Sequence, residues 1–210
     1  MPGRTRTRTG FHPPSLLGSL VSWLRGHEEL FVQPAESLPR LFIVYPRGKR
    51  AHAELLAAVY THTLPGLPEE LRERYYAMLR RLPPVIVVEL RAWNTCDCLG
   101  HVHPAGAESR VTRRLASDLG GSVAEIDLAY KAIERWRPQP IASLAAGDAV
   151  AGFEQYHLKA ALLCVLLHEL DHIADPEKRE RDVRSESNEF YSKVLRTMIE
   201  EDTGTPYGIE

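Results

Sequence analysis

The sequence predicts an α+β fold, with a small mixed sheet, a buried helix and a further helix near the C-terminus. Short runs of branched apolar residues, typical of strands, occur at Leu41–Tyr45, Val85–Leu90 and Val123–Leu128. Longer segments repeat apolar residues at helical spacing. Because helices precede and follow the strands instead of alternating with them regularly, the order favours α+β over α/β.

The composition argues against several classes of protein. The chain has 210 residues, 44% of them hydrophobic and 26% charged, which suits one globular domain with or without a small extra lobe. A formal net charge of -2 supports binding neither to nucleic acid nor to a membrane surface. The longest apolar stretch, Ala160–Leu167, is too short to span a bilayer. Because 3 cysteines make no disulfide framework, we expect a reducing compartment, the cytoplasm.

The N-terminal part of the chain is expected to form a tail and a helical lobe. Residues 1–14 alternate arginine and threonine and then reach glycine and two prolines, a composition typical of a disordered tail. Residues 15–82 are expected to form the lobe, with helices at about 15–24, 49–62 and 68–81. The two prolines that follow end the last of these helices.

Residues 83–203 are expected to form the domain that carries the chemistry, followed by a short tail at 204–210. Val85–Leu90 is the strongest strand signal, and Val123–Leu128 alternates apolar with acidic side chains. A long helix at about 154–174 and a charged helix ending near Glu201 complete the domain.

The motif His168-Glu169-Leu170-Asp171-His172 lies at the end of the long predicted helix. The two histidines are one helical turn apart, so their imidazoles share a face and can bind one zinc ion. Glu169 comes from the same turn and can accept a proton from a metal-activated water that attacks a carbonyl. The residues before the motif are apolar on every side, so polar groups there are costly without a metal or strong partners. The alternative is a surface helix end with incidental histidines.

A catalytic zinc site needs a third protein ligand, and the last helix offers Glu186 and Glu189. On a helical projection, an apolar stripe that includes Val183, Phe190 and Val194 marks the buried side. Glu189 points away from the centre of that stripe, whereas Glu186 lies on its flank. The projection therefore favours Glu186 and leaves Glu189 as the alternative.

This pattern resembles the gluzincin metallopeptidases, with His168 to His172 followed by Glu186-Ser187-Asn188-Glu189-Phe190. It is most similar to the compact ImmA/IrrE-like and minigluzincin-type members. The resemblance implies a compact zincin-like domain, a zinc peptidase activity on peptide or protein substrates, and Glu186 as third ligand. It also implies that an edge strand, either Val123–Leu128 or the strand before it, binds an extended peptide antiparallel. Nothing before Val85 takes part in the resemblance.

Other interpretations stay open. The five residues of the motif are also similar to peptide deformylase, a metal amidase whose third ligand is a cysteine, and Cys98-Leu99-Gly100 echoes its cysteine segment. A different gluzincin alignment, on Asn188-Glu189, makes Glu189 the ligand but leaves Lys193 where an aspartate is expected. A non-catalytic, zinc-stabilised regulatory or binding protein would carry the same ligands.

The loop after the second strand concentrates residues that can bind metal, namely Cys96, Cys98, His101 and His103. Their spacing is tighter than that of a structural zinc site, which usually draws on two separated pairs. An ordinary loop, a second metal site and a redox-sensitive cap over the first site are the three interpretations.

Overall fold

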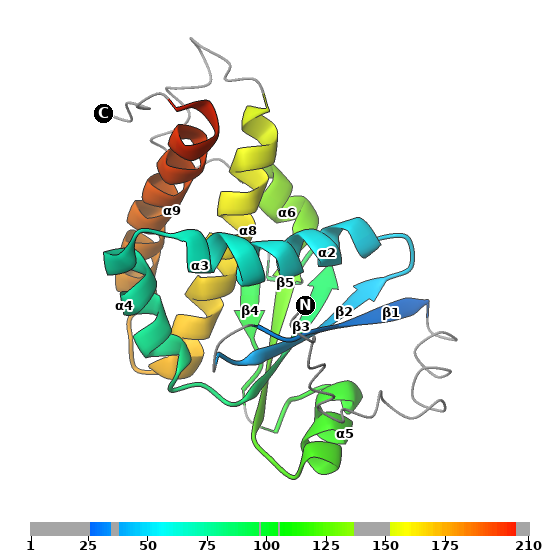
Figure 1. Ribbon diagram of the computed structural model, residues 1–210. Coiled ribbons are helices and arrows are strands. Elements are labelled where there is room, and N and C mark those ends of the chain that lie inside the picture. The colour runs from blue at the N-terminus through cyan, green and yellow to red at the C-terminus, as the bar shows by residue number, and fades with distance from the viewer. Residues whose placement is uncertain (1–25, 35–37, 97, 105, 137–151, 205–210) are drawn as a thin grey trace, which may run out of the picture.

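The computed structural model describes residues 26–34, 38–96, 98–104, 106–136 and 152–204 (Figure 1). The expected terminal tail at 1–14 and the helix expected at 15–24 lie outside these residues. Within the described residues, no helix is both long and apolar enough to cross a membrane.

A five-stranded mixed sheet forms the centre of the molecule, in the order β1-β2-β3-β5-β4. The three inner strands are parallel: β2 (Arg40–Pro46), β3 (Val85–Arg91) and β5 (Val123–Ala129). The two outer strands, β1 (His27–Val32) and β4 (Gly100–Val102), run antiparallel to their neighbours. All three predicted strands are confirmed to within a residue, and the mixed sheet with its helices agrees with the expected α+β class.

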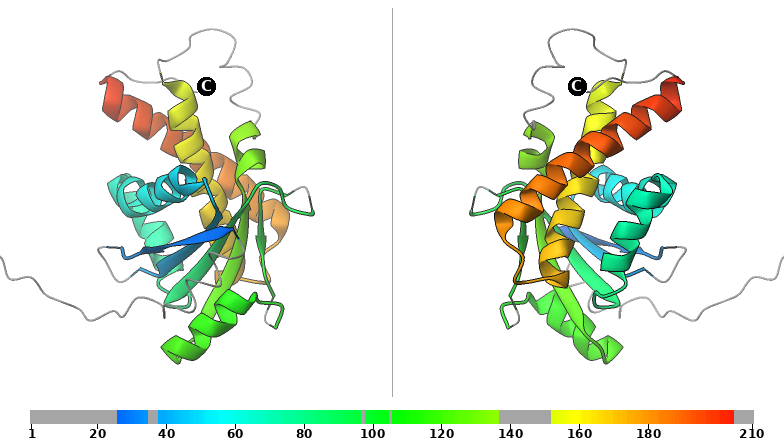
Figure 2. Two further views of the ribbon diagram at one scale, coloured as in Figure 1. Left: turned by 90° about the vertical axis from the view of Figure 1, so that its right-hand side faces the viewer. Right: turned by 90° about the vertical axis from the view of Figure 1, so that its left-hand side faces the viewer.

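Most of the helices cover one face of the sheet, and α5 packs against the other (Figures 1 and 2). The helical elements are α2 (Arg50–Ala58), η1 (Val59–Thr63), α3 (Leu64–Gly66), α4 (Glu69–Leu79), α5 (Arg110–Leu119), α6 (Tyr130–Arg135), α8 (Phe153–Ala174) and α9 (Glu180–Thr203). Strand alternation separates the two faces: Ile86 and Val88 join the main core, whereas Val85 and Val87 face α5.

Helix α8 lies in the main core between the sheet and α9. Its residues Ala160–Leu167 are all buried, because a helix that is apolar on every side has no polar face to expose to solvent. The buried helix predicted at 154–174 is therefore confirmed. The motif histidines lie in its last two turns, where the helix emerges from the core.

The helices expected at about 49–62 and 68–81 are confirmed as α2 with η1 and as α4, but the N-terminal segment also contributes strands to the sheet. Its strands β1 and β2 belong to the same sheet as β3 and β5, and one core runs from Val32 to Ile199. The physical reason is that β2 pairs with β3 in register from Arg40 to Val44, a long-range pairing that local periodicity cannot reveal. Strand β1 was not predicted, since Glu28 and Glu29 interrupt its apolar pattern.

Candidate metal centre

The motif histidines face a cavity of about 840 Å³ between the C-terminal half of α8, strand β4 and the start of α9. It is lined by Cys96, Cys98, Leu99, Gly100, His101, Val102, Trp136, Cys164, Val165, His168, Glu169, His172, Glu180, Arg184, Ser187 and Asn188. Segments far apart in the sequence therefore meet at one concave site, as ligand-binding sites commonly require.

Three side chains form a candidate metal-binding group in this cavity: His168, His172 and Glu180. Their ligand atoms all lie within 4.8 Å of one another. Glu180 Oε2 is 2.9 Å from His172 Nε2 and 3.5 Å from His168 Nε2, and the two imidazole centroids are 4.9 Å apart. Two imidazoles and a carboxylate are a donor set that suits zinc.

The other nitrogen of His168 is held by α9. His168 Nδ1 lies 3.0 Å from Ser187 Oγ, so the imidazole has a fixed orientation with Nε2 toward Glu180. Burial lowers the pKa of His168, which keeps the imidazole neutral and able to donate its lone pair at neutral pH. Burial would raise the pKa of Glu180, but the nearby His168, His172 and Arg184 outweigh it and lower that pKa.

Glu169 is buried at the back of the cavity, with 6% of its surface exposed. It packs against Gly100 of β4 so closely that a Cβ at Gly100 would lie within 2.7 Å of its Cγ, Cδ and Oε1 atoms. Burial, and then the neighbouring Glu180, raises the pKa of Glu169 to about 8. A carboxyl group with a pKa near neutrality can both accept and return a proton.

The raised pKa of Glu169 predicts how the stability of the metal-free protein depends on pH. Its pKa of about 8 in the folded state is above the ordinary value of 4.5. This group therefore stabilises the fold fully below the lower pKa, and the contribution is lost as pH rises through the higher one. Urea denaturation with a chelator present should show a free energy of unfolding that falls between about pH 5 and pH 8. Glu169→Gln should flatten this fall, and equal slopes in both proteins would contradict the assignment.

The structure does not bring Glu186 to the imidazoles, in contrast to the expectation from the sequence. Its carboxylate pairs with Lys178, 2.8 Å away, and with Arg74 of α4. Glu189 pairs with Lys193 on the exposed side of α9, as its position opposite the apolar stripe predicted. The reason for the difference is helical phase: Glu186 lies on the flank of the stripe that faces α4, and the opposite flank faces the cavity.

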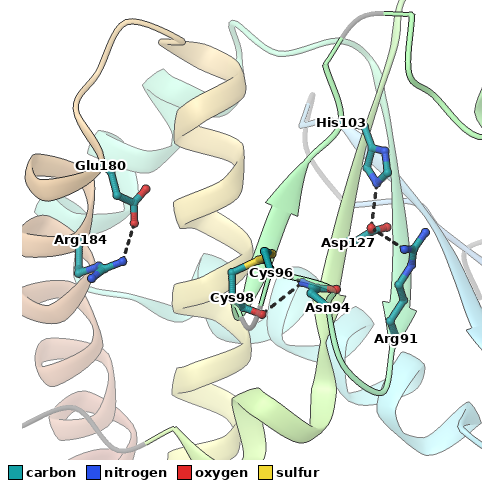
Figure 3. The surroundings of a disulfide bond; sticks show 8 residues. All are labelled: Arg91, Asn94, Cys96, Cys98, His103, Asp127, Glu180 and Arg184. Atoms are coloured by element: carbon teal, nitrogen blue, oxygen red, sulfur yellow. Dashed lines mark hydrogen bonds and ion pairs between the residues drawn. A yellow bond between two sulfur atoms is a disulfide. The ribbon is translucent and has the colours of Figure 1, made fainter.

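Glu180 was missed by the sequence reasoning. It lies in the first turn of α9, which begins at Glu180 itself. The spacing of Glu180, Arg184 and Ser187 places them on one face of α9, but only the structure shows that this face lines the cavity. Glu180 Oε1 also accepts a hydrogen bond from Arg184, which holds the carboxylate beside the histidines (Figure 3).

Strand β4 borders the cavity and has one open edge. Among the described residues it pairs only with β5. Leu99 O accepts a hydrogen bond from Ala129 N, and His103 N donates to Glu125 O. Because inward and outward groups alternate in an antiparallel ladder, the backbone N–H and C=O of Gly100 and Val102 point toward the open edge.

The cysteine-rich loop divides into two groups. Cys96 and Cys98 form a disulfide at the cavity (Figure 3). Their sulfur atoms and a ring nitrogen of His101 are a second candidate metal-binding group. His103 does not belong to this group, because its Nε2 pairs with Asp127 Oδ2 on β5 at 2.8 Å. His157 Nδ1 and the Tyr191 hydroxyl are 2.6 Å apart in the core, and neither residue lines the cavity.

Comparison of the chain with protein-family models, with curated proteins and with solved structures found no match. The function is therefore argued from the geometry of the site.

Proposed function

We propose that this protein is a zinc-dependent peptidase of the gluzincin type, with a zincin-like fold. The observation that carries the proposal is a single cavity that holds a His168–His172–Glu180 ligand set, the buried carboxylate of Glu169 and the open edge of β4. A metal-stabilised structural site needs only the ligands. The buried Glu169 and the open strand edge are the features that favour catalysis.

His168, His172 and Glu180 would hold the zinc ion, with Ser187 and Arg184 orienting them. Glu180 replaces Glu186 as the proposed third ligand, because the carboxylate of Glu186 pairs with Lys178 and Arg74. When bound, zinc supplies a Lewis acid that polarises the scissile carbonyl and acidifies water.

Glu169 would take the proton from the attacking water and pass it to the leaving amine. Its burial against Gly100 fixes the carboxylate in one position and excludes bulk water from one side of it. Burial raises the pKa of Glu169 to about 8, which favours the protonated carboxyl group that the second half of the transfer would require.

The substrate would be an extended peptide that adds to β4 as an antiparallel strand. The outward backbone groups of Gly100 and Val102 offer hydrogen bonds to any peptide backbone, so they fix direction and register without selecting a sequence. The substrate-binding role would fall to β4 and not to β5 (Val123–Ala129), because β5 lies between β3 and β4 and has no open edge.

Metal analysis tests the ligand set. The purified protein should contain about one zinc ion per chain, and His168→Ala or Glu180→Ala should remove most of it. Glu186→Ala is the matched control on the same helix and should keep the zinc, because its carboxylate pairs with Lys178 and Arg74. The measurement is zinc stoichiometry by mass spectrometry of the native protein. Loss of zinc from Glu186→Ala with retention in Glu180→Ala would restore the original assignment of Glu186.

A deformylase-like amidase is the second candidate, because Cys98 lines the same cavity. It would require a thiolate as third ligand, whereas Glu180 lies beside both imidazoles and the sulfur of Cys98 is bonded to Cys96. Cleavage of an unfolded protein by the zinc-loaded enzyme, abolished by a chelator, supports the peptidase. Release of formate from N-formyl peptides without cleavage of the unfolded protein would support the amidase instead.

A further inference from the structure

Three metal-binding side chains lie at the cavity in addition to the His168–His172–Glu180 set. The sulfur atoms of Cys96 and Cys98 and one ring nitrogen of His101 lie within 4.8 Å of one another. Cys96 and His101 are exposed and Cys98 is half-buried, so ions and reductants reach them from solvent. Figure 3 shows the sulfur pair beside β4 and α8.

The third cysteine behaves differently. Cys164 is buried in α8 and donates a hydrogen bond to Ser187 O. Burial raises the pKa of its thiol to about 12, so it stays protonated and unreactive. The chain therefore has one accessible cysteine pair and one inert thiol.

We propose that Cys96, Cys98 and His101 form a second, redox-gated metal site that binds zinc or a similarly soft divalent cation only when the disulfide is reduced. In the oxidised form each sulfur is bonded to the other and offers no thiolate. Reduction by a dithiol breaks the Sγ–Sγ bond with two electrons and two protons, and the dithiol becomes a disulfide. Metal binding then releases the two thiol protons, because thiolates are the ligands.

The geometry suits such a site after reduction. Zinc binds sulfur at about 2.3 Å and nitrogen at about 2.0–2.1 Å, so ligand atoms of one tetrahedral site are roughly 3.5–3.8 Å apart. The His101 nitrogen already lies within 4.8 Å of both sulfur atoms, and once reduction breaks the bond between the sulfurs they are free to move apart to this spacing. His101 has a fixed position because it lies on β4, paired with Asp127 of β5. A hydrogen bond also holds the backbone at Cys98, since Asn94 Nδ2 donates to Cys98 O at 3.3 Å.

This second site does not depend on the peptidase function, because it shares no ligand with the first metal group. It does lie at the same cavity, so its occupant would stand beside the open edge of β4. A change of redox state would therefore decide whether a second metal ion stands at the cavity, without altering the His168–His172–Glu180 set.

Zinc and cobalt titrations of the full chain test the proposal. Zinc stoichiometry should be about one per chain in the oxidised protein and about two after reduction by dithiothreitol and its removal without oxygen. With cobalt, the reduced protein alone should gain the intense thiolate charge-transfer band. Cys96→Ser/Cys98→Ser should bind about one zinc in both states. His168→Ala should keep the redox-dependent increase, which separates this site from the first.

His101→Asn checks the third ligand and leaves the thiols in place. It should weaken the zinc that binds after reduction by roughly tenfold or more. Equal zinc content in the reduced and oxidised protein, or a reduced cobalt form without the thiolate band, would overturn the proposal. Cys164 is the internal control, because it should resist alkylation in both states.

Discussion

Glu169→Gln is expected to lower the rate of peptide cleavage by roughly 10²–10⁴-fold while the protein keeps its zinc. Glutamine has nearly the same volume as glutamate and fits the same space against Gly100, so the cavity should stay intact. It cannot accept the proton of the attacking water. The ligands His168, His172 and Glu180 are unchanged, so metal binding should not depend on this substitution.

Two measurements on the same preparation check this result: zinc content by native mass spectrometry, and the kcat/KM for cleavage of an unfolded protein. Glu189→Gln is the matched control, because its carboxylate is exposed on α9 and pairs with Lys193 outside the cavity. Loss of zinc from Glu169→Gln would show that Glu169 is structural. Full activity with zinc retained would move the hydrolysis to another site or to a contaminant.

Gly100→Ala is expected to damage both stability and activity. The added Cβ would lie within 2.7 Å of three atoms of Glu169, so the Glu169 side chain must shift from its observed position. Overpacking of this kind costs about 1–3 kcal/mol of unfolding free energy. Displacing a proton acceptor by about 1 Å lowers activity by roughly 10²-fold. Urea denaturation and kcat/KM measure the two effects.

A glycine without neighbours provides the control. Gly66 at the end of α3 has nothing within 4 Å of its Cβ position, so Gly66→Ala should be neutral or slightly stabilising. In a double-mutant cycle, Glu169→Ala should remove most of the stability cost of Gly100→Ala, since the clashing atoms are gone. An equal cost in both backgrounds would mean that the damage comes from the β4 backbone and not from contact with Glu169.

The substitutions Glu169→Gln and Gly100→Ala test the same contact, each at one of its two residues. Glu169 is one residue from a ligand in the sequence, but its position in the cavity depends on β4, which lies far from it in the chain. A side chain at position 100 would displace the Glu169 side chain from its observed position. The proposed general base and the proposed substrate-binding edge therefore share one contact.

The sequence determined the local elements of this protein. A long segment that is apolar on every side identified α8, and runs of branched residues identified β2, β3 and β5 to within a residue. The spacing of His168 and His172 identified a shared helix face, and the apolar residues before them identified a buried helix. These features depend on neighbours within a turn or a strand, and local sequence contains that information.

Only the tertiary structure decided which carboxylate meets the imidazoles and what surrounds Glu169. Glu180, Glu186 and Glu189 all lie on one helix, and each has a carboxylate long enough to bind a metal. The choice depends on the rotation of α9 against α8, which the packing of Val183, Phe190 and Tyr191 fixes. The contact between Gly100 and Glu169 likewise depends on β4 pairing with β5. Helix phase and strand order are set by long-range packing, and no local pattern contains them.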